Sequence, residues 1–216
     1  LQVPSPKELE QMGNEQQDRL LPKAATELKI ETPASYGREK ELKQLAQILT
    51  GNFHRNTLLV GPTGTGKTAL VWELARRQSE FKLPGKIWET TASTLIKELM
   101  KDTGWQENLS LLCRELSGQP DLLFVRNLMD LFEVGKYEGN TVSIADYLLP
   151  YLSRGEVTLI SECTDEELAR IEIKSPSYLN VFQRLTITEP ESGELEQIIQ
   201  QKANDLARGQ RISIDP

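Results

Sequence analysis

The sequence predicts an α/β protein in which helices on both sides sandwich a parallel sheet. Short apolar runs with strand character alternate with stretches whose apolar residues recur at helical spacing, and this alternation is typical of a parallel sheet. The apolar run at 57–60 leads directly into a glycine-rich turn and a helix-forming stretch. With 216 residues, of which 38% are hydrophobic, the chain is long enough for one substantial domain with a buried core.

The first 33 residues are predicted to be a polar linker or N-terminal extension, and a folded α/β domain is predicted over 34–190. Prolines interrupt the linker and limit its helices to short segments around 7–12 and 21–28. These prolines are Pro4, Pro6, Pro22 and Pro33. A closing segment, 191–216, is predicted to begin a further helical element, with Leu195, Ile198, Ile199 and Leu206 on one face.

Within the domain, the pattern predicts a regular order of helices and strands. A helix with apolar residues at 42, 45, 48 and 49 ends before Gly51, which stands where a left-handed helix terminus favours glycine. Thr164 and Glu167 form the pattern of a capping box at the start of a later helix. The predicted strands are 57–60, 86–89, 122–125, 157–161 and 185–188, and the other predicted helices are 68–78, 93–100, 106–116, 142–152 and 164–171.

Composition argues against binding to nucleic acid or to a membrane. The chain has 25 Lys plus Arg against 32 Asp plus Glu, a net charge of −7, whereas a protein that binds a phosphate backbone presents a basic face. Its mean hydropathy is −0.43 and its pI is near 5.0. No apolar run approaches the length of about 18 residues that a membrane-spanning helix needs.

The cysteines and the single histidine point to a cytoplasmic protein without a metal or disulfide framework. Cys113 and Cys163 show no CxxC or ligand spacing, so we expect two small buried or semi-buried thiols in a reducing compartment. His54 lies in a polar stretch, and with one histidine a His-dependent nucleophile is nearly excluded. The chain begins at Leu1 without a signal-peptide pattern and reads as an excised fragment.

The strongest chemical signal is a phosphate-binding loop that fits GxxxxGK[ST]. It consists of Gly61, Pro62, Thr63, Gly64, Thr65, Gly66, Lys67 and Thr68. Glycines let consecutive backbone N–H groups point into one concavity, and the following helix adds the positive end of its dipole. Lys67 would reach the β- and γ-phosphates, and the Thr68 hydroxyl would bind Mg²⁺. The loop therefore predicts a site for ATP or ADP with Mg²⁺.

The residues that would hydrolyse the nucleotide are missing from their expected place. Hydrolysis needs an acidic pair at the end of a second strand, one residue in the Mg²⁺ shell and one that polarises the attacking water. The candidate strand 122–125 is followed by Arg126 and Asn127, which can do neither. Asp130 and Glu133 lie further on and are expected to be solvated loop acids. We therefore assign no catalytic residue.

Several segments, in order, resemble the first nucleotide-binding module of Clp-type AAA+ unfoldases and disaggregases. The resemblance covers about residues 20–216 and is most specific at 148–156, where a helix is followed by Arg-Gly-Glu and a strand. It is carried by 36–39 (YGRE), 61–68, 122–125, 144–156 (IADYLLPYLSRGE), 164–167, 178–183 (YLNVFQ) and 189–190. It implies a P-loop NTPase (AAA+) fold, with the large α/β subdomain over 34–190 and the start of the small helical subdomain over 191–216.

The resemblance also implies roles for residues outside the loop. Tyr36 and Gly37 match the segment whose backbone contacts adenine, Ala69 continues the phosphate-binding segment, and Thr164, beside Cys163, falls where the family places a polar sensor of the γ-phosphate. The cofactor-binding residues are thus Tyr36, Gly37, Gly61, Pro62, Thr63, Gly64, Thr65, Gly66, Lys67, Thr68, Ala69 and Thr164, with Thr68 as the metal ligand.

The chain also departs from the family pattern at functional positions. Arg126 and Asn127 replace the family's Asp-Glu pair, and Asn180 and Val181 stand where members carry two arginines that enter a neighbour's site. The aromatic pore-loop position falls at Asp102. For Trp105 we favour a packed or surface residue over a shifted aromatic grip, and for Arg126 we slightly favour a pair with Asp130 over a replacement charge in the phosphate site.

These features predict an ATP-binding AAA+ module that is hydrolytically weak or inactive. In a larger chaperone or unfoldase it would support nucleotide-dependent assembly with other copies, in a ring of six, and a protein substrate is a further expected partner. Three other interpretations stay open: a working ATPase that uses Asp130 or Glu133, a small-molecule or nucleoside kinase, and a scaffold whose loop no longer binds nucleotide. Nucleotide titration and phosphate release distinguish them.

Overall fold

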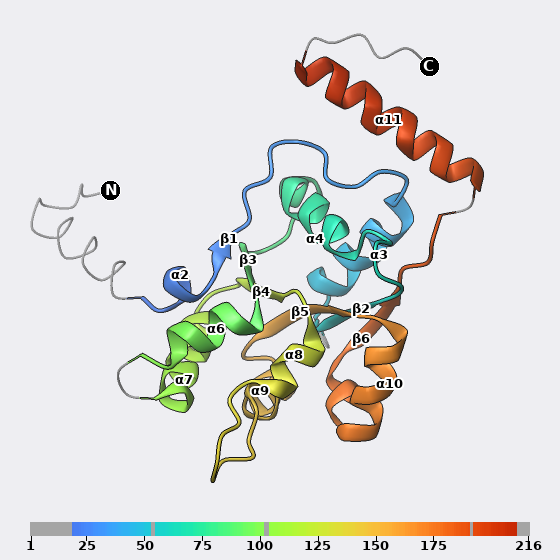
Figure 1. The fold of residues 1–216 in the computed structure, drawn as a ribbon. Helices are drawn as coiled ribbons and strands as arrows, with labels where there is room; N and C mark the ends of the chain where they lie inside the picture. The colour runs from blue at the N-terminus through green and yellow to red at the C-terminus, as the bar shows by residue number, and fades with distance from the viewer. Residues whose placement is uncertain (1–18, 53–54, 102–103, 191, 211–216) are drawn as a thin grey trace, which may run out of the picture.

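The computed structural model describes residues 19–52, 55–101, 104–190 and 192–210, and these form a six-stranded sheet with helices on both faces (Figure 1). The strand order is β1-β3-β4-β5-β2-β6. All neighbouring pairs are parallel except β1 with β3. The strands are β1 (Thr26–Glu27), β2 (Thr57–Val60), β3 (Ile87–Thr90), β4 (Leu122–Val125), β5 (Thr158–Cys163) and β6 (Gln183–Thr186). The predicted α/β fold is confirmed, with one antiparallel edge strand added.

The central strands form because their residues are buried on both sheet faces. Every residue of β2 and of β4 is buried, which is the continuous apolar pattern of parallel strands covered by helices. The helices are α2 (Leu21–Ala24), α3 (Glu39–Thr50), α4 (Lys67–Arg76), α5 (Gln78–Phe81), α6 (Ala92–Leu99), α7 (Trp105–Ser117), α8 (Leu128–Glu133), α9 (Ile144–Ser153), α10 (Asp165–Lys174) and α11 (Ser192–Gln210), with a 3₁₀ turn η1 (Tyr178–Val181).

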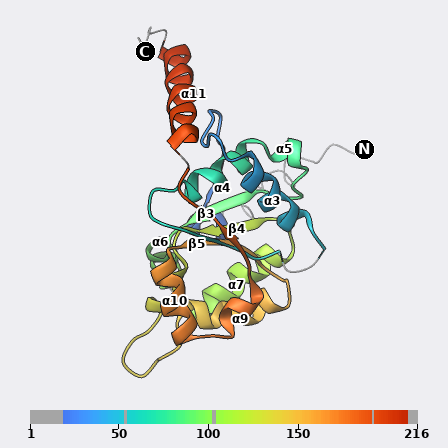
Figure 2. The ribbon, with the colours of Figure 1, turned by 90° about the vertical axis from the view of Figure 1, so that its right-hand side faces the viewer.

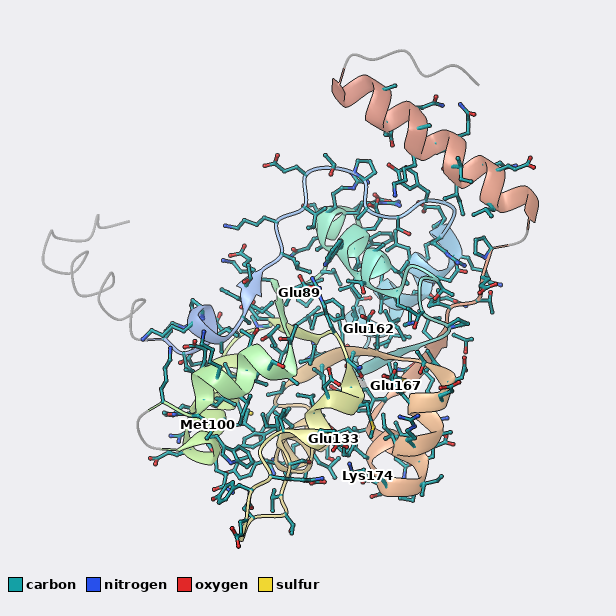
Figure 3. The ribbon with its side chains drawn as sticks, viewed as in Figure 1. Glu89, Met100, Glu133, Glu162, Glu167 and Lys174 are labelled. Atoms are coloured by element: carbon teal, nitrogen blue, oxygen red, sulfur yellow. The ribbon has the colours of Figure 1, made fainter. Side chains whose placement is uncertain are left out.

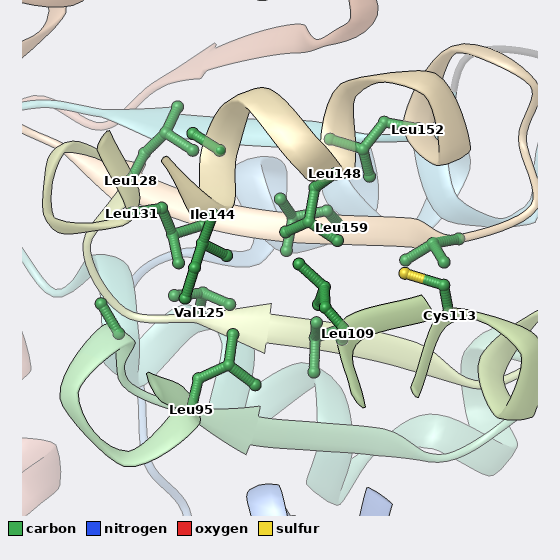
Figure 4. Packing of buried hydrophobic residues seen from close by; sticks show 14 of the residues in the cluster. Leu95, Leu109, Cys113, Val125, Leu128, Leu131, Ile144, Leu148, Leu152 and Leu159 are labelled. Carbon is green, nitrogen blue, oxygen red and sulfur yellow. The ribbon is translucent and has the colours of Figure 1, made fainter. Parts of the chain in front are cut away.

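Two apolar clusters, one on each side of the sheet, make up the core. The smaller packs α3 and α4 against β2 and β4 through residues such as Leu45, Leu70 and Phe124. The larger packs α2 and α6–α9 against the opposite face. Figure 4 shows side chains of this cluster meeting over the sheet, among them Leu109 of α7 and Leu148 of α9. The view turned by 90° shows the sheet between these two helical layers (Figure 2).

Several predicted elements differ from the observed ones for identifiable reasons. The helix expected over 21–28 stops at Ala24, and β1 follows because Thr26 and Glu27 pair with β3 at the sheet edge. Gly51 is extended (φ −66°, ψ 163°) rather than left-handed. The last strand begins at Gln183, two residues before the predicted start. Helix α8 and turn η1 were not predicted, and the helix expected at 7–12 lies outside the described residues.

The C-terminal helix α11 extends away from the sheet domain (Figures 1 and 2). Of the apolar residues expected on one face, Leu195 and Ile199 are exposed. Ile198 instead lies against Gly37: a Cβ atom built on Gly37 would be 3.0 Å from Cγ1 of Ile198. Among the described helices, none has the length and apolar character needed to cross a membrane.

Both cysteines are buried free thiols, as predicted. Burial raises the pKa of Cys113 and of Cys163 to about 12. At pH 8 such a thiol is about one part in 10⁴ thiolate, the reactive form. We therefore expect Ellman's reagent to label less than about a tenth of the thiols within an hour in the native protein, and both in guanidinium chloride. Rapid labelling of one thiol without denaturant would contradict this burial.

Candidate nucleotide-binding site

The glycine-rich loop connects the end of β2 at Val60 to the start of α4 at Lys67. Gly64 and Gly66 have φ of 88° and 91°, left-handed values that residues with a Cβ rarely adopt. Gly66 is also the residue that precedes the first turn of α4. The free N–H groups of that first turn therefore point to the mouth of the loop, where a phosphate is favoured by the helix dipole.

The close approach of the Ile187 backbone explains why residue 61 is a glycine. A Cβ at this position would lie 2.1 Å from the carbonyl oxygen of Ile187, so only glycine fits. The Gly61 amide donates to the carbonyl of Cys163 (3.2 Å), and the Ile187 amide donates to that of Val60 (2.7 Å). These bonds fix the start of the loop against β5 and the segment after β6.

Lys67 is buried and lies over the loop. Its Nζ donates hydrogen bonds to the carbonyl oxygens of Gly61 (2.7 Å) and Pro62 (2.8 Å), and the Thr65 hydroxyl also donates to Pro62 (2.9 Å). The ammonium group is thus held in the concavity by neutral acceptors. Phosphate oxygens are stronger acceptors for a lysine than carbonyl groups, because the hydrogen bond is then charge-assisted on both sides.

The Thr68 hydroxyl contacts a carboxylate that the sequence analysis did not single out. Thr68 Oγ1 donates to Glu162, at 2.8 Å from Oε1 and 3.0 Å from Oε2. Burial raises the pKa of Glu162, although the Thr68 hydrogen bond and the charges of Lys67 and Arg126 oppose this rise. A hydroxyl and a carboxylate are both hard oxygen ligands of the kind that Mg²⁺ prefers, so this pair fits the predicted cation.

Arg126 has a different partner from the one predicted. Its Nε forms an ion pair with Glu89 of β3 at 2.6 Å, and not with Asp130. The guanidinium lies over the ring of Trp72, 5.5 Å from the centroid, and Trp72 Nε1 also donates to Glu89 (3.3 Å). The parallel pairing of β3 with β4 explains this partner, because it brings Glu89 beside the end of β4. Arg126 is therefore held at the wall of the site.

A pocket of about 460 Å³ joins the loop to the carboxyl ends of β4 and β5. Its lining includes Thr63, Gly64 and the 66–69 segment, together with Thr164, so these predicted residues surround one space. Arg126, Asn127, Glu162 and Glu167 complete its polar wall. In Figure 3, Glu162 is labelled between Glu89 and Glu167. Gly61, Pro62 and Thr65 of the loop are not among the residues that line the pocket; the Pro62 carbonyl accepts hydrogen bonds from Lys67 and from Thr65.

Thr164 acts as the cap of α10, which confirms the predicted capping box. Its hydroxyl lies 3.2 Å from the Glu167 amide, and the Glu167 carboxylate accepts from the Thr164 amide (2.7 Å). Asn127 Nδ2 also donates to Glu167, at 3.0 Å. Because these groups already bind one another, the carboxylate of Glu167 is engaged in holding the start of α10.

The segment with Tyr36 and Gly37 lies outside this pocket, between α4 and α11. Burial and a hydrogen bond with Asp205 raise the pKa of Tyr36. Gly37 has a left-handed φ of 67°. The next residue, Arg38, donates to the carbonyls of Thr65 (3.2 Å) and Thr188 (2.6 Å) and thereby joins this segment to the loop. Sequence reasoning missed this connecting role of Arg38.

Glu73 of α4 holds the start of the same segment. Its carboxylate accepts from the Ala34 amide at 2.9 Å and forms an ion pair with Arg76 at 2.5 Å. Burial alone would raise the pKa of Glu73, but the hydrogen bonds from Arg76 and Ala34 outweigh it and lower the pKa. The segment that leads to Tyr36 is therefore anchored to the helix that follows the loop.

The other candidate acids and Trp105 lie outside the pocket. Asp130 is exposed, and Glu133 forms an ion pair with Lys174 at 2.5 Å, away from Glu162 (Figure 3). Neither lines the pocket. Trp105 is packed in the core, edge-on to Tyr147, as favoured above. The predicted pore-loop position Asp102, like His54, lies outside the described residues.

Comparison with known proteins shows which families and structures the chain is similar to. Residues 34–123 match the family described as AAA ATPase domain. The chain is 28% identical over 184 residues to chaperone protein ClpB of Aquifex aeolicus. This alignment covers 82% of this chain and 18% of the relative. It is 32% identical over 170 residues to chloroplastic chaperone protein ClpC2 of Arabidopsis thaliana, covering 76% of this chain and 18% of the relative.

A third relative and two solved structures extend the comparison. The chain is 29% identical over 171 residues to the ATP-dependent Clp protease ATP-binding subunit ClpL of Staphylococcus aureus, covering 76% of this chain and 24% of the relative. It spans 18% to 24% of the length of these three relatives. The S. cerevisiae Hsp104-ADP complex has the same fold (TM-score 0.69, 24% identity, 83% of this chain and 26% of that chain). So does the Hsp104:casein complex (TM-score 0.70, 23% identity, 88% and 34%). The chain is therefore a homologue of the Clp-type AAA+ proteins and contains an AAA ATPase domain with their P-loop NTPase fold.

Proposed function

We propose that this chain is the nucleotide-binding module of a Clp-like chaperone or unfoldase, and that it binds ATP and ADP with Mg²⁺ without fast hydrolysis. The observation that carries the proposal is the pocket in which Lys67, Thr68 and the open first turn of α4 face the same space. The Lys67 ammonium exchanges its carbonyl partners for phosphate oxygens. Thr68 would hold the cation through its hydroxyl oxygen, and the cation would supply positive charge that neutralises the phosphates.

Slow hydrolysis is expected because the acidic pair that hydrolysis needs after the second strand is absent. Arg126 and Asn127 follow β4, and neither accepts a proton from water. Glu167 lies in the pocket but is bound to Thr164 and Asn127. Asn180 and Val181 of η1 carry no cation that could enter a neighbouring copy, and such an arginine contributes about 10³- to 10⁵-fold in rate.

In a longer protein, the module would serve assembly rather than turnover. By its resemblance to Clp proteins, nucleotide binding would stabilise a ring of six copies that acts on a protein substrate in the cytoplasm. Two of the relatives are called chaperones, and one Hsp104 structure contains casein. A module that binds nucleotide persistently can hold neighbouring copies together while other modules hydrolyse ATP.

Steady-state phosphate release from the purified chain tests the proposal. We expect turnover at least about 10³-fold below the typical enzyme range of about 1–10³ s⁻¹, while calorimetric titration shows saturable binding of both ATP and ADP. Brisk release that Lys67→Ala abolishes would overturn the slow-hydrolysis part, and in that case Asp130→Ala and Glu133→Ala identify unconventional acids. No binding at millimolar nucleotide would leave only a scaffold role. Phosphate transfer to an added small molecule would indicate a kinase.

A further inference from the structure

The Thr68 hydroxyl and the Glu162 carboxylate form a hydrogen bond in the pocket beside the phosphate-binding loop. Thr68 is the second residue of α4, and both carboxylate oxygens of Glu162 lie within 3.0 Å of its hydroxyl oxygen. The two side chains line the same pocket as Lys67. Their pairing joins the phosphate-binding loop to a strand that is distant in the sequence.

The sheet explains how Glu162 reaches this position. Strand β5 lies between β4 and β2, and Glu162 pairs in register with Leu59 of β2. The preceding residue, Ser161, pairs with Val125, the last residue of β4. Because the three strands are parallel, their carboxyl ends meet at the edge that carries the loop. Glu162 on β5 is therefore in register with Arg126, which follows the neighbouring strand β4.

The chemistry of the hydroxyl group shows what this contact does. A threonine hydroxyl has one proton to donate and two lone pairs to offer. When the proton is directed to Glu162, a lone pair is left for a cation held by nucleotide phosphates. In nucleotide-hydrolysing proteins with this loop, the threonine and an acidic residue from a neighbouring strand hold Mg²⁺ together.

The other polar groups at this edge are already engaged. Arg126 is positively charged and directed to Glu89. Asn127 accepts from the Met129 amide through Oδ1 and donates to Glu167 through Nδ2. Among the described residues that line the pocket, Glu162 is the carboxylate that accepts a hydrogen bond from Thr68.

We propose that Glu162 supplies, from β5, the carboxylate that positions Thr68 and the waters around a nucleotide-bound Mg²⁺, in place of the missing acid after β4. This inference rests on the proposed nucleotide binding and adds a positioning residue to it. It also accounts for the proposed combination of nucleotide binding and slow hydrolysis, because a carboxylate that accepts hydrogen bonds from Thr68 and from waters around the metal is not free to polarise the attacking water.

The test is the gain in nucleotide affinity that Mg²⁺ produces, measured by calorimetric titration of ADP in Mg²⁺ and in EDTA. We expect Glu162→Gln to reduce this gain by about 10- to 100-fold, the usual effect of removing a group that orients metal ligands. Binding in EDTA should be unchanged or tighter, since a negative charge near the phosphates is removed. Thr68→Val should lose the same gain, and the double variant should lose no more than either single variant.

Matched controls separate the possible outcomes. Asp130→Asn removes an exposed carboxylate outside the pocket and should leave the Mg²⁺ gain unchanged. Glu162→Asp retains the charge and should recover part of the gain, which also covers the case in which Glu162→Gln does not fold. An unchanged gain in Glu162→Gln, or an equal loss of affinity in EDTA, would overturn the inference alone. Failure of the unmodified chain to bind ADP would instead overturn the proposed function.

Discussion

Lys67→Ala is expected to weaken ATP and ADP binding by at least about 100-fold. The Lys67 ammonium lies within the loop, 2.7 Å and 2.8 Å from two carbonyl oxygens that phosphate oxygens would replace. A hydrogen bond to a charged group contributes about 1.5–3 kcal/mol, and every 1.4 kcal/mol is tenfold in affinity. Calorimetric titration of each nucleotide in Mg²⁺ measures the change.

Two controls show that such a loss comes from the phosphates. Lys43→Ala removes an exposed lysine of α3 and should leave affinity unchanged. AMP lacks the β- and γ-phosphates that Lys67 would contact, so its weak binding should differ little between the variant and the unmodified chain. If ATP binds Lys67→Ala as tightly as it binds the unmodified chain, the loop is not the phosphate site.

The loop and the central strands were predictable because their signals are local in the sequence. Strands β2 and β4 have the predicted bounds, since each is a run of four residues, all apolar except Thr57, next to turn or polar residues. The start of α10 was predictable because a capping box needs only Thr164 and Glu167, three positions apart. Strand β1 has two residues, too few for any periodicity, and it forms only because the edge of β3 offers partners.

The walls of the site were not predictable, because they depend on the register between strands. For Arg126 the nearest acid in the sequence was favoured, whereas its partner Glu89 lies 37 positions away and is brought close by the pairing of β3 with β4. The strand predicted to end at Ser161 continues to Cys163, which places Glu162 within the sheet. A charged residue between two small residues at the end of an apolar strand was the available signal for Glu162.

Asn56 was also missed, since it closes a polar stretch and carries no motif. It is buried in the structure just before β2 and bonds to three separate segments. Its Nδ2 donates to the carbonyls of Leu152 and Val181, both at 3.2 Å, and its Oδ1 accepts from the Leu159 amide at 2.9 Å. One side chain therefore joins the start of β2, which leads to the loop, to α9, η1 and β5.

Asn56→Ala is expected to lower the free energy of unfolding by about 3–5 kcal/mol, because each buried polar group left without a partner costs about 1–3 kcal/mol. For a chain of this size that corresponds to a fall in Tm of about 10 °C. Asn52→Ala, in the same polar stretch but exposed, should change Tm by less than about 2 °C. Thermal unfolding followed by circular dichroism compares the two.

Equal Tm values for both variants would mean that the Asn56 hydrogen bonds contribute nothing to stability. Added Mg·ADP should raise the Tm of Asn56→Ala and of the unmodified chain alike, since Asn56 lies outside the nucleotide pocket.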